Sequence, residues 1–195
     1  MKIIGLCGGS GSGKGTACAF FNDLGVKSID TDRLYHSIIS TDSECAKELV
    51  EAFGTEIKAN PGIDRAKLRK VVFSSKESLA LLNDITHRHI LSEVRSIIKD
   101  QMDGIGIIID APLLFESGFD KECDVTVAVI ADEHVRIDRI MKRDGISEEI
   151  AKARIASQIP SEELIRRCDY TLRNDTTEQE LRQNVEQLYS IIFEK

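Results

Sequence analysis

The chain has 195 residues, of which 42% are hydrophobic and 30% are charged, a composition typical of a soluble globular protein with one well-buried core. Its formal net charge of −7 argues against nucleic acid as a partner. No apolar run approaches the ~20 residues that cross a bilayer. We therefore expect a cytoplasmic protein that binds neither nucleic acid nor membrane.

Five cysteines are scattered along the chain without a CxxC pair, at Cys7, Cys18, Cys45, Cys123 and Cys168. The first segment, residues 1–7, is too short and too glycine-interrupted for a signal peptide, so an odd, scattered set of cysteines indicates reduced thiols in the cytosol. Cys7 and Cys18 are expected to be small buried apolar residues.

Short apolar runs alternate with longer amphipathic stretches. The patterns predict strands at 2–7, 26–30, 105–110, 125–130 and 169–172, and helices at about 14–24, 33–53, 64–102, 132–157 and 176–194. Several strands are apolar on both faces, as strands between two layers of helices must be. The alternation therefore predicts an α/β fold with a parallel sheet flanked by helices.

Two intervals are longer than a crossover connection needs. Some 75 residues separate the second predicted strand from the third, which indicates a helical insertion. From about 132 to 168 the chain is helical and rich in arginine. This arginine-rich segment is either a mobile lid or a solvated helix pair with i,i+4 salt bridges.

A glycine-rich segment, GGSGSGK at 8–14, joins the first predicted strand to a helix, which is the required setting of the G-x-x-x-x-G-K phosphate-binding loop. The expected ATP contacts are Gly9, Ser10, Gly11, Ser12, Gly13, Lys14, Gly15 and Thr16. Gly15 stands where most such loops carry the hydroxyl that binds Mg²⁺, and the hydroxyl follows at Thr16. We therefore expect Mg²⁺ to be held mainly through phosphates and water.

Carboxylates end two of the predicted strands, at the sheet edge where open α/β folds bind their ligands. Asp32 is expected either to accept a proton from an acceptor hydroxyl or to cap the helix that follows. Asp30 fits a site role and a structural role equally. Asp110 ends the apolar run 107–109, a pattern that can hold a Mg²⁺-bound water beside a phosphate loop.

Six motifs in chain order resemble the dephospho-CoA kinase family. They are GLCGGSGSGKGT at 5–16, DTDRLYH at 30–36, LNDITHRHI at 82–90, DAPLLFE at 110–116, RIMKRDGIS at 139–147 and RIASQ at 154–158. The resemblance covers essentially the whole chain and implies a P-loop NTPase-type sheet. It also implies transfer of the γ-phosphoryl group of ATP to the ribose 3′-hydroxyl of dephospho-CoA, the last step of coenzyme A synthesis.

The family pattern implies a role for particular residues of this chain. Asp32 would be the catalytic base, Lys14 the phosphate clamp, Arg143 a lid arginine that faces the phosphates, and Asn174 an adenine contact. His87 and Arg88 would lie near the acceptor. The implied divisions are a nucleotide-binding core at about 1–32, 105–131 and 169–195, a helical acceptor subdomain at 33–104, and a lid at 132–168.

Two other functions stay open on the residues alone. The GKGT sequence at 13–16 is also familiar from nucleoside monophosphate kinases, so the acceptor could be a nucleoside or its monophosphate. A nucleotide-binding regulator without catalysis is the third possibility. The H-x-H pair of His87 and His89 has no third ligand nearby in sequence, which argues against zinc.

Overall fold

The computed structural model of the chain describes residues 1–73, 75–101 and 103–194. The chain divides into two compact units, one made of Met1–Ile29 with Met102–Lys195 and the other of Asp30–Gln101. No helix in these described stretches is long and apolar enough to span a membrane.

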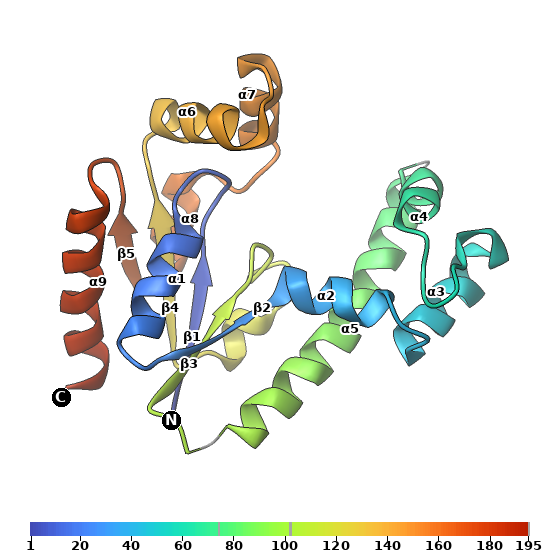
Figure 1. Ribbon diagram of the computed structural model, residues 1–195, viewed down its shortest axis with the longest axis horizontal. Helices are drawn as coiled ribbons and strands as arrows, with labels where there is room; N and C mark the ends of the chain where they lie inside the picture. Colours follow the sequence, from blue (N-terminus) through green and yellow to red (C-terminus); the bar gives the residue numbers. More distant parts are fainter. Residues whose placement is uncertain (74, 102, 195) are drawn as a thin grey trace. The chain divides into compact units, whose positions relative to one another are not determined.

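The first unit is built on a five-stranded sheet (Figure 1). Its strands are β1 (Lys2–Cys7), β2 (Lys27–Asp30), β3 (Gly106–Asp110), β4 (Val125–Ile130) and β5 (Tyr170–Arg173), in the order β2-β3-β1-β4-β5. The registers of β1 with β3, β1 with β4 and β4 with β5 are parallel. The predicted fold class is confirmed, and each predicted strand lies within one residue of the observed one.

One face of this sheet carries the main hydrophobic core. Ile4 and Leu6 of β1 pack there against α1 (Lys14–Asp23) and α9 (Glu178–Phe193), which Figure 1 shows side by side. Because side chains alternate along a strand, Gly5 and Cys7 face the other way. A Cβ added at Gly5 would lie 2.8 Å from a methyl carbon of Leu114, so that face is closely packed as well.

The arginine-rich segment forms three helices, α6 (Glu133–Asp144), α7 (Glu148–Ala156) and α8 (Ser161–Arg167). The prediction of one helix over 132–157 is therefore wrong. Gly145 ends α6 with a φ of 64°, and the Ser147 hydroxyl accepts a hydrogen bond from the Ile150 N–H to start α7. Ile140 and Ala151 are fully buried between the two helices, in a small core of their own.

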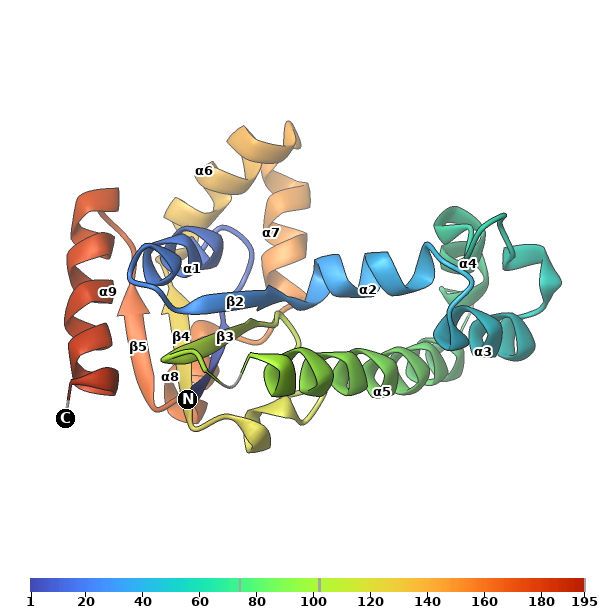
Figure 2. The same ribbon diagram turned by 60° about the horizontal axis from the view of Figure 1, so that its bottom comes forward.

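The second unit is helical, as the long insertion predicted (Figure 2). Its helices are α2 (Thr31–Ile39), α3 (Glu44–Phe53), α4 (Arg65–Val72) and α5 (Lys76–Asp100). The long helices predicted over 33–53 and 64–102 are each two helices, because Ser43 and Ser75 cap new helix starts at α3 and α5. Residues 74 and 102 of the second prediction lie outside the described part. Ile39, Leu49, Ile57 and Ile85 belong to the separate core of this unit.

Candidate active site

The phosphate loop, residues 8–14, connects β1 to α1. Gly11 and Gly13 have φ values of 78° and 89°, a backbone region that residues with a Cβ rarely adopt. A Cβ at Gly13 would also lie 2.0 Å from the side-chain nitrogen of Asn174. The N-cap residue of α1 is Gly13, which has no side chain to cap the first N–H groups, so this helix end is suited to an anion.

Three successive carbonyl groups of the loop are bound by side chains from later in the chain. The Arg136 Nε donates to the carbonyl of Ser10 at 2.9 Å, and the Arg139 Nη1 donates to that of Gly11 at 3.3 Å. Asn174 Nδ2 donates to the carbonyl of Ser12 at 2.8 Å. Since each peptide group is planar, fixing the carbonyl direction also fixes the direction of the N–H group on the same peptide unit.

Gln158 joins the loop to Arg136. Its Oε1 accepts hydrogen bonds from the Ser10 N–H at 3.0 Å and from Arg136 Nη2 at 2.9 Å, while its Nε2 donates to the Ser10 hydroxyl at 3.0 Å. Arg136 is only 5% exposed. We name this set the Gln158 cluster: Ser10, Arg136 and Gln158. Arg136 lies in the arginine-rich segment and Gln158 ends the RIASQ motif, but the sequence patterns assign neither residue a role.

Lys14 and Asp110 form an ion pair, with side chains 16% and 13% exposed. The pair brings together two residues that the sequence reasoning placed at one site, since Lys14 starts α1 and Asp110 ends β3. Thr16 lies in the first turn of α1 and is half-buried. The described residues contain no group of three His, Cys, Asp or Glu side chains that could hold a metal ion. A lone carboxylate and a hydroxyl fit a Mg²⁺ ion that takes its other ligands from phosphate and water.

Arg143 lies at the end of α6 with its side chain 60% exposed. Its Nε and Nη2 donate to the two carboxylate oxygens of Asp144 at 2.7 and 3.0 Å, and Arg154 donates to the same carboxylate. These hydrogen bonds, that of Arg143 first, hold the pKa of Asp144 well below its ordinary value. The predicted lid arginine is therefore oriented by its neighbour in the chain.

Asn174 follows β5 and is 6% exposed. Its side-chain oxygen accepts from Arg139 Nη2 at 3.4 Å, and its backbone carbonyl accepts from Arg139 Nη1 at 2.9 Å. With its nitrogen bound to Ser12, Asn174 supports the phosphate loop directly. Its contact with adenine stays a prediction.

The hydrogen bond that caps α2 distinguishes between the roles expected for Asp30 and Asp32. The Asp30 carboxylate accepts from the Arg33 N–H at 2.9 Å, so Asp30 is the cap of this helix. Asp32 lies exposed in the first turn and does not cap it. The capping role expected for Asp32 therefore belongs to Asp30, and the role of Asp32 as a base stays a prediction.

His87 and Arg88 lie on α5 of the second unit, next to a cluster built on Glu48 of α3. Arg88 Nη2 donates to Glu48 Oε1 at 2.6 Å, and His89 Nε2 lies 2.8 Å from Glu48 Oε2. Arg88 and His89 hold the pKa of Glu48 below its ordinary value. We name Glu48, Arg88 and His89 the Glu48 cluster. The pairing of His89 with Glu48 gives the H-x-H motif a structural explanation.

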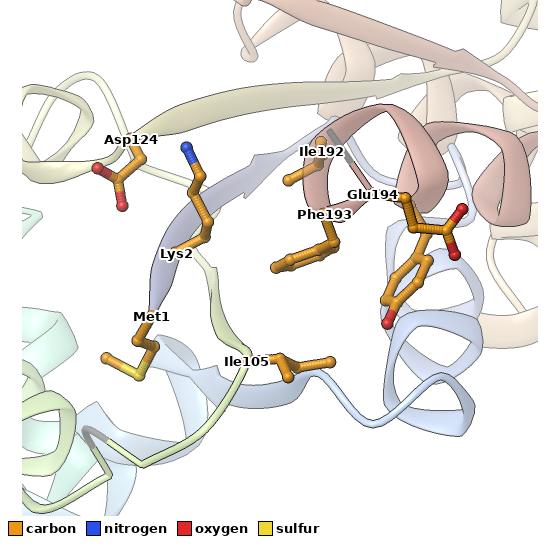
Figure 3. A pocket seen from close by; sticks show the side chains of 8 residues that line it. Met1, Lys2, Ile105, Asp124, Ile192, Phe193 and Glu194 are labelled. Carbon is orange, nitrogen blue, oxygen red and sulfur yellow. The ribbon is translucent and has the colours of Figure 1, made fainter.

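A hollow of about 490 Å³ lies at the opposite, amino-terminal edge of the sheet (Figure 3). Lys2 of β1, Ile105 before β3, Asp124 before β4 and Phe193 of α9 line it. Parallel α/β sheets bind their ligands at the carboxyl ends of the strands. This hollow is therefore separate from the phosphate loop and its chemistry.

Comparison with known proteins agrees with the motifs. The family model described as dephospho-CoA kinase matches residues 2–180. The dephospho-CoA kinase of Fusobacterium nucleatum is 38% identical over 193 residues, which cover 98% of this chain and 99% of that protein. The enzyme of Carboxydothermus hydrogenoformans is 37% identical over 188 residues, 95% and 91% of the two chains.

A solved structure extends the likeness to three dimensions. The dephospho-CoA kinase of Campylobacter jejuni superposes with a TM-score of 0.72 at 28% identity, over 98% of this chain and 97% of that one. The sheet and its phosphate loop are those of the P-loop NTPase-type fold. On its motifs, its fold and these relatives, the chain belongs to the dephospho-CoA kinase family.

Proposed function

We propose that the chain transfers the γ-phosphoryl group of ATP to the ribose 3′-hydroxyl of dephospho-CoA, as the last step of coenzyme A synthesis in the cytoplasm. The observation that carries the proposal is the phosphate loop with its Lys14–Asp110 pair, in a chain whose family model spans residues 2–180. The expected substrates are two small molecules, ATP and dephospho-CoA.

Phosphoryl transfer needs alignment and charge stabilisation more than covalent chemistry. The backbone N–H groups of the phosphate loop bind the β-phosphate, and Lys14 exchanges its Asp110 partner for phosphate oxygens. Arg143, exposed at the end of α6, neutralises charge on the transferring group, and the arginine-rich segment acts as a lid that excludes water. Asn174 contacts adenine.

In this proposal, residues of the second unit bind the acceptor and accept its proton. Asp32 accepts the proton of the attacking 3′-hydroxyl, because it is exposed and Asp30 already caps α2. His87 and Arg88 bind the acceptor. Asp110 and Thr16 would hold Mg²⁺ through water, and the ion supplies charge neutralisation on the ATP phosphates.

The activity is tested by ADP release from ATP·Mg²⁺ with dephospho-CoA, AMP or adenosine as the acceptor. We expect ADP release that depends on dephospho-CoA alone. Turnover of AMP or adenosine instead would show that the phosphate loop serves a different acceptor. ATP binding without turnover of any acceptor would indicate a regulator.

The base is tested by a matched pair of neighbouring variants. Asp32→Asn is expected to lower kcat by about 10²–10⁴-fold, because the acceptor loses its proton acceptor. Asp30→Asn is expected to stay close to wild type, since asparagine caps a helix as well as aspartate does. Equal kcat values for the two variants would show that Asp32 is not the catalytic base.

A further inference from the structure

The fold brings together two cysteines that lie 161 residues apart in the chain. Cys7 is the last residue of β1 and is 1% exposed, and Cys168 lies half-buried between α8 and β5. Their Sγ atoms are 3.5 Å apart, the distance of a weak thiol hydrogen bond. The phosphoryl transfer described above uses neither thiol.

Backbone hydrogen bonds hold the two thiols in place. Cys7 lies in register with Ala128 of β4, so its position is fixed by the sheet. The Cys168 N–H donates to the Leu164 carbonyl at 3.0 Å, and the N–H of the next residue, Asp169, donates to the Thr126 hydroxyl at 3.0 Å. The two thiols therefore belong to the framework of the first unit.

The two thiols differ in pKa and in exposure. The hydrogen bond from Cys7, aided by Thr126 and Arg167, lowers the pKa of the Cys168 thiol against the opposing effects of burial and Asp169. The same hydrogen bond, followed by burial, raises the pKa of the Cys7 thiol, with Lys14 opposing and Glu116 adding to the shift. Cys168 is also the more exposed of the two, so an oxidant reaches it first.

We propose that Cys7 and Cys168 form a modification site, a dithiol that a two-electron oxidant of the peroxide class closes to a disulfide. The Cys168 thiolate attacks one oxygen of hydrogen peroxide, the O–O bond breaks, and Cys168 becomes a sulfenic acid. The departing hydroxide takes up the proton that the Cys168 thiol released and forms the first water. Cys7 then attacks the Cys168 sulfur, the S–O bond breaks, and water leaves with the Cys7 proton. Two thiols and one peroxide thus give one disulfide and two waters, and a thiol reductant reverses the change.

Closing the disulfide acts on the phosphate loop from both sides. A disulfide bond of about 2.05 Å requires the sulfur atoms to approach from their separation of 3.5 Å. Cys7 is bonded directly to Gly8 of the loop, and Gly9 is packed so closely that an added Cβ would lie 2.3 Å from Arg136 Nη2. Cys168 leads into β5, after which Asn174 holds the Ser12 carbonyl. We expect kcat/KM for ATP to fall about tenfold, since a misplacement of about 1 Å can cost 10²-fold.

The disulfide is tested by thiol counting and mass spectrometry on the whole protein treated with hydrogen peroxide. We expect the loss of two thiols, a mass decrease of about 2 Da, and a tryptic cross-link between the peptides 3–14 and 168–173. Cys168→Ser should abolish all three changes. Retention of all five thiols, or a cross-link that joins a different pair, overturns the site.

Cys123 supplies the matched control, since it too is half-buried. Burial, followed by nearby carboxylates, raises the pKa of the Cys123 thiol to about 12, so it should resist the oxidant. Cys123→Ser should therefore form the same cross-link as wild type. A cross-link that disappears in Cys123→Ser and persists in Cys168→Ser would assign the reactive thiol to Cys123 and contradict the proposal.

The effect on catalysis rests on the proposed function, whereas the cross-link does not. Peroxide should lower the ADP release of wild type, dithiothreitol should restore it, and Cys168→Ser should keep its activity throughout. Full activity in the cross-linked protein overturns the link to the phosphate loop. A chain that forms the cross-link yet never phosphorylates dephospho-CoA would contradict the proposed function and leave the modification site established.

Discussion

The Gln158 cluster of the first unit and the Glu48 cluster of the second unit are built in opposite ways. In the Gln158 cluster, a 5% exposed arginine and a glutamine bind backbone and side-chain groups of Ser10. In the Glu48 cluster, side chains of α3 and α5 pair with one another at the surface, with Arg88 56% exposed and Glu48 35% exposed.

This difference decides what each cluster can do. Removing one partner from a buried polar group leaves the other without a hydrogen bond, which costs about 1–3 kcal/mol. Exposed ion pairs contribute about 0–1 kcal/mol, because water replaces the lost partner. The Gln158 cluster is therefore suited to fix the phosphate loop in one shape. The Glu48 cluster can exchange its partners at little cost, which suits the acceptor-binding role proposed for Arg88.

The largest effect is expected from Lys14→Met, which removes the charge from the phosphate loop and keeps a side chain of similar length. Lys14 contacts the reacting phosphates in the proposed mechanism, so kcat should fall about 10²–10⁴-fold. Arg166→Met is the control, since Arg166 lies exposed on α8 and pairs only locally with Glu163. Near-normal turnover by Lys14→Met would contradict the assignment of the phosphate site.

A smaller effect, on both the free energy of unfolding and the KM for ATP, is expected from Gln158→Leu. The Ser10 N–H and Arg136 Nη2 lose their shared acceptor, so the free energy of unfolding should fall by about 1–3 kcal/mol. The phosphate loop loses its support in the same step, so the KM for ATP should rise more than kcat falls. Urea unfolding and initial-rate kinetics measure the two effects.

The matched control for that variant is Gln187→Leu, the same substitution at an exposed position of α9. It should leave both the stability and the KM for ATP near their wild-type values. If Gln158→Leu behaves like Gln187→Leu, the hydrogen bonds of the Gln158 cluster do not hold the loop.

The Glu48 cluster is tested by comparing Arg88→Ala with Glu48→Ala. Both remove the same ion pair, so each should change the free energy of unfolding by less than about 1 kcal/mol. Only Arg88→Ala also removes a proposed acceptor contact. It should raise the KM for dephospho-CoA several-fold and leave the KM for ATP unchanged, while Glu48→Ala raises neither. Equal KM values for the two variants would show that Arg88 serves structure alone.

The sequence predicted what short-range patterns determine. Short segments of four to six residues predicted all five strands to within one residue, and the spacing of the phosphate loop located Lys14. Helix ends were missed where one serine starts a new helix inside an amphipathic pattern, as Ser43 and Ser147 do. The predictions followed the spacing of apolar residues, whereas the capping serine is the signal that marks these helix starts.

The supports of the site could not be predicted, because they join residues that are far apart in the chain. Gln158 binds Ser10 across 148 residues, Asn174 binds Ser12 across 162, and Cys168 meets Cys7 across 161. No local pattern marks such partners. The sheet order, which places β1 next to β4 and β4 next to β5, brings Cys168 and Asn174 near the end of β1, and the arginine-rich segment brings Gln158 there.

The smallest effect concerns Asp144, which orients Arg143 from the end of α6. Because hydrogen bonds from Arg143 and Arg154 lower the pKa of the folded carboxylate, Asp144 stabilises the protein above its unfolded pKa of about 3.9. That contribution is lost as the pH falls through the folded pKa. Wild type should therefore be slightly more stable than Asp144→Asn in urea at neutral pH, and the difference should shrink below about pH 4. A difference that is the same at every pH would show that the charge of Asp144 has no part in holding Arg143.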